Sequence, residues 1–82
     1  MYETYILQSQ INQKYYIGHT QNIGNRISRH NRGLVHSTKT GAPWEVIHLE
    51  SFETKSEAYR RELEIKSYKG GNAFKRLIGK IQ

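Results

Sequence analysis

The sequence predicts an α+β domain in which helices flank a small three-stranded antiparallel sheet. Three segments, at residues 2–8, 14–18 and 44–52, are rich in the β-branched and aromatic residues that strands favour. Helix start signals follow the second and the third of these segments. The predicted order is therefore strand, strand, helix, strand, helix, helix, and we expect residues 1–82 to form a single domain.

The first half of the chain predicts a hairpin followed by a helix. Only the polar segment 9–13 separates the first two strands, a length typical of hairpin connections. Asn22 can cap a helix from about residue 23 to residue 32, and Gly33 can end it. The segment 34–42 has mixed polarity and no period, and we expect a mobile loop there.

The second half of the chain predicts two more helices after the third strand. Residues 54–57, Thr-Lys-Ser-Glu, have the spacing of a capping box and open a helix that runs to about Ser67. The pair Gly70-Gly71 interrupts the chain. Asn72 is then predicted to cap a last helix that runs to about Ile78.

The composition indicates a polyanionic partner. Thirteen Lys and Arg residues face seven acidic residues, all of them Glu, which gives a formal net charge of +6. A basic surface can also serve solubility alone, but in so small a domain it favours contact with nucleic acid. No predicted helix pairs a basic face with a broad apolar one, which argues against binding at a membrane surface.

Absent features narrow the chemistry and the location. The chain has no cysteine, which excludes disulfides, thiolate metal sites and cysteine nucleophiles. Neither a signal peptide nor an apolar stretch of ~20 residues is visible, so we expect a cytoplasmic protein without membrane contact. The four His residues are too scattered for a zinc site, and no glycine-rich phosphate-binding loop is present. Without heptads or a large apolar stripe, we expect a monomer.

Polar side chains lie on the predicted inner face of the first helix. At about 100° per residue, His30 points between Ile23 and Ile27. Arg26 stands beside His30 on the same side. A helix that needed only an apolar stripe would have no histidine there. The alternative is a histidine at the edge of the core that one backbone hydrogen bond satisfies.

The helix after the third strand carries a similar anomaly. Glu62 shares the predicted inward face with Ala58 and Ile65. A buried carboxylate without a partner is costly, so Glu62 needs a cation, a metal ion or a water-filled cleft. An ion pair with Arg26 is the structural alternative, and Lys66 is placed for an i,i+4 pair. The other charged side chains of this helix are expected on its solvated surface: Glu57, Arg60, Arg61 and Glu64.

Together these residues suit the hydrolysis of phosphodiester bonds. Glu62 can bind one divalent metal ion whose other ligands are water and phosphate oxygens. Arg26 can neutralise the charge that grows on the phosphate. His30, Tyr5 and Tyr16 can orient the attacking water or accept its proton, although tyrosines in strands are more often core residues.

The spacing of these residues resembles that of the GIY-YIG nuclease superfamily. Residues 16–31 match the pattern Tyr-Ile-Gly-x-Thr-x-Asn-x-x-x-Arg-x-x-x-His-Asn. Residues 3–5, Glu-Thr-Tyr, stand where the family has Gly-Ile-Tyr, so only the tyrosine is kept. Residues 57–62 resemble the helical segment that carries the metal-binding glutamate of the family, and Glu62 takes its position.

The resemblance extends over nearly the whole chain. Residues 37–39, 43–44 and 66–70 are similar to the short stand-alone bacterial subgroup labelled UPF0213. The resemblance implies a three-stranded antiparallel sheet flanked by helices, and cleavage of DNA with one divalent metal ion, Mg²⁺ or Mn²⁺.

The resemblance also implies a role for each candidate residue. Glu62 would bind the metal ion and Arg26 would contact the phosphate. Tyr5 would be the general base or activate the water, with Tyr16 and His30 supporting it through hydrogen bonds. Which tyrosine acts as the base is left open by the sequence.

We therefore expect a metal-dependent DNA endonuclease that acts in DNA repair or recombination, with RNA as an alternative substrate. Two other functions stay open. One is a nucleic-acid-binding module without catalysis, because the first motif is degenerate, and the other is a nuclease subunit that is active only with a partner protein. Phosphate contacts with little base readout are expected from the basic surface residues, which are Arg29, Arg32, Lys39, Arg60, Arg61, Lys66, Lys69, Lys75 and Arg76.

Overall fold

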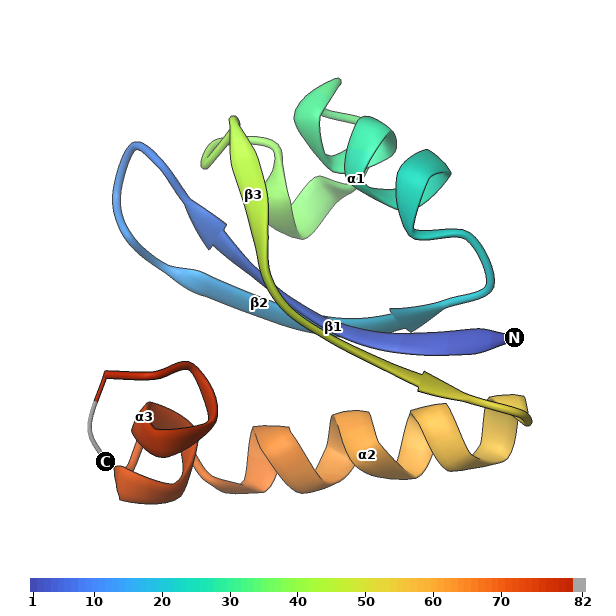
Figure 1. Cartoon of the computed structure of the whole chain (residues 1–82). Coiled ribbons are helices and arrows are strands. Elements are labelled where there is room, and N and C mark those ends of the chain that lie inside the picture. The colour runs from blue at the N-terminus through green and yellow to red at the C-terminus, as the bar shows by residue number, and fades with distance from the viewer. Residues whose placement is uncertain (81–82) are drawn as a thin grey trace.

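The predicted three-stranded antiparallel sheet flanked by helices is confirmed. The computed structural model describes residues 1–80. Its elements are β1 (Tyr2–Ser9), β2 (Tyr15–Thr20), α1 (Ile23–Asn31), the 3-10 helix η1 (His36–Thr38), β3 (Trp44–Phe52), α2 (Lys55–Ser67) and α3 (Asn72–Leu77). The strand order is β2-β1-β3, which leaves β2 and β3 at the two edges. Figure 1 shows α1 on one face of the sheet and α2 with α3 on the other.

The central strand β1 is covered on both faces. Residues 4–7 are all buried, although successive side chains of a strand point to opposite sides. Tyr5 and Leu7 lie on the α1 side of the sheet, whereas Ile6 packs with Ile65 of α2. Each fully buried isoleucine contributes about 1.5–3 kcal/mol to stability. Because β1 buries side chains on both of its faces, both helical layers pack against the sheet through this one strand.

A glycine in β2 is required by the tyrosine opposite it. Tyr5 pairs directly with Gly18, and side chains of directly paired residues share one face of a sheet. A Cβ atom at position 18 would lie 2.6 Å from the Tyr5 hydroxyl oxygen and 2.8 Å from Tyr5 Cζ. The phenol ring of Tyr5 therefore lies over the backbone of the edge strand, in space that only glycine leaves free.

The predicted ends of the two longer helices are confirmed. Asn22 caps α1, and its side chain accepts a hydrogen bond from the backbone of Asn25. Gly33 follows α1 with a φ of 74°, the left-handed conformation that ends many helices. Thr54 and Glu57 form the capping box of α2. In the described part of the chain, no helix has the length and apolar character needed to cross a membrane.

Two local predictions are wrong. Asn72 does not cap α3, because it is the first helical residue. The N-cap is Gly71, and no side-chain hydrogen bond caps the helix there. The segment 34–42, expected to be a mobile loop, contains η1 and is anchored to the fold. Thr38 in this segment is buried, and its carbonyl accepts a hydrogen bond of 2.8 Å from Trp44 Nε1. Anchoring by a buried side chain and a carbonyl leaves no periodic signal in the sequence.

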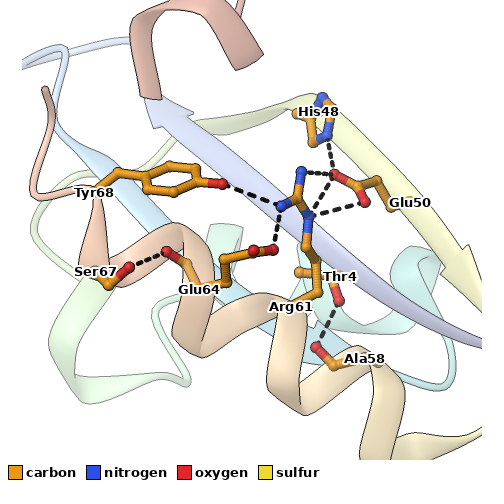
Figure 2. Close-up of polar contacts among 8 residues, drawn as sticks. All are labelled: Thr4, His48, Glu50, Ala58, Arg61, Glu64, Ser67 and Tyr68. Carbon is orange, nitrogen blue, oxygen red and sulfur yellow. Dashed lines mark hydrogen bonds and ion pairs between the residues drawn. The ribbon is translucent and has the colours of Figure 1, made fainter. Parts of the chain in front are cut away.

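Arg61 fastens α2 to β3, contrary to its expected place on the solvated surface. Its Nε donates to the two carboxylate oxygens of Glu50 at 3.0 and 3.1 Å. The same guanidinium contacts Glu64 and Tyr68, and His48 donates to Glu50 at 2.7 Å (Figure 2). Burial alone would raise the pKa of the Glu50 carboxyl, but the hydrogen bonds from Arg61 and His48 outweigh it and lower this pKa.

Replacing Gly18 tests the contact with Tyr5. We expect Gly18→Ala to lower the free energy of unfolding by about 1–3 kcal/mol, because the new methyl group meets the phenol. Combined with Tyr5→Phe, which removes the nearest atom, the loss should be smaller than the sum of the two single losses. Urea unfolding monitored by the fluorescence of Trp44 measures both. Gly24→Ala, at an exposed helical position, is the control, and an equal response at both glycines would contradict the contact.

Replacing Arg61 tests how α2 is docked. Arg61→Ala should lower the free energy of unfolding by about 1–3 kcal/mol, because it leaves the half-buried Glu50 carboxylate without its main partner. Arg60→Ala on the same helix removes an exposed guanidinium that reaches only Ser56, at 3.5 Å, and should stay within about 0.5 kcal/mol. Equal losses in the two variants would show that the Glu50 pair does not hold the helix.

Candidate active site

The first helix places two of the predicted site residues at the sheet. His30 lies on the inner side of α1 and is completely buried, which confirms its predicted direction. Arg26, one turn earlier, is half-buried. Arg29 and Arg32, which point the other way, are exposed.

Two side-chain hydroxyl groups hold His30, in place of the backbone partner that the sequence left open. Its Nδ1 lies 2.7 Å from Thr38 Oγ1, and its Nε2 lies 3.2 Å from the Tyr5 hydroxyl. The Thr38 hydroxyl donates to the carbonyl of Val35, so it accepts from a proton on His30 Nδ1. His30 Nε2 is then an acceptor, and the Tyr5 hydroxyl donates to it. A single neutral tautomer of His30 satisfies the whole chain of hydrogen bonds.

The surroundings favour the uncharged forms of both His30 and Tyr5. Burial lowers the pKa of His30, and the positive charges of Arg26 and Arg29 lower it further. Burial also raises the pKa of Tyr5, and the neighbouring Tyr16 adds to this. At neutral pH the pair is therefore a neutral imidazole and a neutral phenol.

Tyr16 is the more accessible of the two candidate tyrosines. It is half-buried, whereas Tyr5 is only 2% exposed. The ring centroid of Tyr16 lies 4.9 Å from that of His30 and 6.4 Å from that of Tyr5. The three rings form one aromatic cluster, and Tyr16 is the member with access to solvent.

Glu62 is buried, which confirms its predicted inward direction on α2, and it lies on the opposite face of the sheet from α1. It is 8% exposed. His19 of β2 donates from Nδ1 to Glu62 Oε1 at 2.6 Å. Lys66 donates to Glu62 Oε2 at 2.5 Å, which confirms the predicted i,i+4 pair. Both carboxylate oxygens thus have cationic or polar partners, as burial of a charge demands.

The two halves of the site meet at the free edge of β2. Arg26 does not pair with Glu62, because α1 and α2 lie on opposite faces of the sheet (Figure 1). Arg26 and His19 instead line one cavity of about 250 Å³ at the end of β2. Besides burial, the charges of Arg26 and Glu62 act on the pKa of Tyr5, in opposite directions. Four of the predicted residues thus lie on the α1 side of the sheet, whereas Glu62 lies on the α2 side, where it contacts His19.

Sequence reasoning missed two residues of this region, His19 and Lys55. His19 contacts Glu62 and lines the cavity, and Lys55, the first residue of α2, lines the same cavity. A signal for His19 was present: alternation along β2 places it on the same face as Ile17, toward α2. A polar residue on that covered face is the same kind of anomaly that marked His30 and Glu62.

The predicted nucleic-acid contacts lie on two sides of the molecule. One exposed group accompanies α1 and η1, and the other accompanies α2 and the turn after it. Arg61 belongs to neither group, because its guanidinium is bonded to Glu50. The first group is Arg29, Arg32 and Lys39, and the second is Arg60, Lys66 and Lys69. Lys75 and Arg76 are also exposed, on α3, which lies on the same face of the sheet as α2 (Figure 1).

The donor set fits a metal ion that keeps most of its water ligands. Within residues 1–80, no three His, Cys, Asp or Glu side chains gather to hold a metal ion by themselves. Glu62 is the buried carboxylate of that part of the chain. Mg²⁺ is often bound by one or two carboxylates together with water and substrate phosphate oxygens. The side chain of Lys66 is 49% exposed, so it can release the second oxygen of Glu62.

Comparison with known proteins identifies the family of this chain. Residues 1–75 match the family described as the GIY-YIG catalytic domain. The chain is 43% identical over 54 residues to UPF0213 proteins of Staphylococcus aureus strains Mu3 and N315, which covers 65% of this chain and 66% of each relative. It is also similar to a UPF0213 protein of Bacillus halodurans solved by solution NMR, with 29% identity, coverage of 89% and 90% of the two chains and a TM-score of 0.48. The chain belongs to the GIY-YIG family, a family of nucleases.

Proposed function

We propose that the protein is a metal-dependent endonuclease that hydrolyses phosphodiester bonds of DNA, in repair or recombination. The observation that carries the proposal is the buried Glu62 carboxylate, held by His19 beside a cavity that Arg26 also lines. Phosphate chemistry can use a guanidinium that lines a hollow together with a buried carboxylate whose hydrogen-bond partner lines the same hollow. Membership of a nuclease family supports the same reaction.

Glu62 is the residue that would hold the divalent ion, Mg²⁺ or Mn²⁺. When bound, such an ion would offset the charge of the phosphate oxygens. His19 keeps the Glu62 carboxylate oriented through its Nδ1 bond, because a carboxylate fixed by a hydrogen bond does not have to be ordered when the ligand arrives.

Arg26 is the residue that would bind the reacting phosphate. Within residues 1–80 no carboxylate lies within ion-pair distance of it, so its guanidinium is not neutralised by the protein. Its planar fork can give two hydrogen bonds to phosphate oxygens. Lys55 lines the same cavity from α2, and it adds a second positive charge on the opposite side of the strand edge.

Tyr16 is the tyrosine that is better placed to contact the attacking water. The Tyr5 hydroxyl is buried and donates a hydrogen bond to His30, and burial raises the pKa of Tyr5, so loss of the phenol proton is unfavourable. Tyr16 stacks on the same cluster and keeps access to solvent. In this proposal Tyr16 takes the role of the general base, and Tyr5 with His30 holds its ring in place, in contrast to the assignment that the resemblance implied.

Removing the Glu62 charge tests the proposed reaction. We expect Glu62→Gln to lower the rate of DNA nicking with Mg²⁺ or Mn²⁺ by on the order of 100-fold or more, because the metal loses its protein ligand. The rate is measured on plasmid, flap and junction DNA. Glu64→Gln, on the same helix and 56% exposed, should retain the rate. Equal rates for the Glu62 variant and the unsubstituted protein would refute the role of Glu62.

The same substrate panel separates the two other functions. DNA binding without cleavage on any substrate, with or without metal, would favour a binding module that has lost catalysis. Cleavage that begins only when a second protein is added would favour a nuclease subunit.

Tyr5→Phe and Tyr16→Phe divide structure from catalysis. Tyr5→Phe leaves His30 Nε2 without its donor and should lower the free energy of unfolding by about 1–3 kcal/mol. Tyr16→Phe should change it by less than about 0.5 kcal/mol but lower the cleavage rate by on the order of 100-fold. Unfolding and cleavage are measured on both variants at a temperature where both are folded. A larger loss of cleavage rate in Tyr5→Phe than in Tyr16→Phe would indicate that Tyr5 is the general base.

A further inference from the structure

An aromatic cavity lies next to the proposed phosphate site. It has a volume of about 480 Å³ and is lined by His19, Lys55, Ser56 and Tyr59. The rings of His19 and Tyr59 meet edge to face with centroids 5.4 Å apart. Tyr59 is 47% exposed, so its ring is a wall of the cavity rather than a part of the core.

This aromatic cavity and the cavity that contains Arg26 share two residues, His19 and Lys55. The two hollows are therefore adjacent to each other on the surface. One hollow offers the Tyr59 ring, and the other offers the guanidinium of Arg26. Tyr59 also precedes Glu62 by three residues on α2, which places them on neighbouring turns of the same side of the helix.

A flat π-face beside an anion-binding group matches the chemistry of a nucleotide, which has a base and a phosphate. Aromatic side chains bind bases by stacking on their faces, whatever the sequence. In a continuous duplex those faces are covered by the neighbouring base pairs, so only an unpaired or extruded nucleotide can offer one. The volume of the aromatic cavity lies within the range of about 300–1,000 Å³ that is usual for small-molecule sites.

We propose that the aromatic cavity holds the base of an unpaired DNA nucleotide next to the cleaved phosphate, stacked on Tyr59. The proposal rests on the proposed function, because it takes the phosphate at Arg26 as the one that reacts. It makes the preferred substrate a single strand, a flap or a gap, and it makes continuous duplex DNA a poor substrate. Tyr59 acts here as a specificity residue that touches the substrate but takes no part in proton transfer.

A binding experiment without cleavage tests this. The full chain is titrated, in buffer with EDTA, against single-stranded DNA that carries one 2-aminopurine, and against the same strand in a duplex. We expect stacking on Tyr59 to quench the probe in the single strand and not in the duplex. Tyr59→Ala should weaken binding of the single strand at least about fivefold and remove the quenching, whereas Tyr59→Trp should preserve both.

Leu63→Ala is the matched control. Leu63 lies four residues after Tyr59 on α2 and is 46% exposed, but it does not line the aromatic cavity. It should bind both DNA forms as the unsubstituted protein does. Binding of the single strand that is unchanged in Tyr59→Ala, or weakened equally in Leu63→Ala, would overturn the proposal. Quenching with an RNA single strand but not with DNA would overturn the choice of DNA.

The readout separates this inference from the proposed function. Cleavage by the unsubstituted protein, without Tyr59-dependent quenching, would support the proposed nuclease function and contradict the stacking site. Tyr59-dependent quenching without cleavage of any substrate would support the stacking site and contradict the proposed nuclease function.

Discussion

The rest of the structure depends on the docking of α2 beneath the sheet. This helix makes one polar contact with each of the three strands, and the three contacts come from two successive turns of the helix. A buried carboxylate is tolerated on such a helix only when its partner is already in place. The contacts are Ala58 with Thr4 on β1, Arg61 with Glu50 on β3, and Glu62 with His19 on β2.

The edge of β2 turns this docking into a site. Groups from the two faces of a sheet are normally separated by the strands between them. At Gly18 the strand has no side chain, and the Tyr5 ring lies over its backbone. His19, the next residue, turns to the other face and contacts Glu62. Two adjacent residues of one edge strand thus connect the aromatic cluster above the sheet with the carboxylate below it.

The charge of the molecule is arranged around the same edge. The exposed cations of α1 and α2 lie on different sides of the sheet, so the two groups do not form one continuous basic face. Arg26 from α1 and Lys55 from α2 are the pair that meet at a common cavity. A nucleic-acid strand that follows both groups would pass over the end of β2, where the proposed reacting groups are.

Sequence alone determined the local features of this protein. Caps, strand composition and helical periodicity predicted the order of elements, the ends of α1 and α2, and the inward directions of His30 and Glu62, because each depends on residues a few positions apart. The tertiary structure decided which groups those buried side chains meet. His19 as the partner of Glu62, Thr38 as the partner of His30 and the docking of Arg61 on Glu50 depend on sheet register and on which face each helix covers. These are long-range properties that no local pattern encodes.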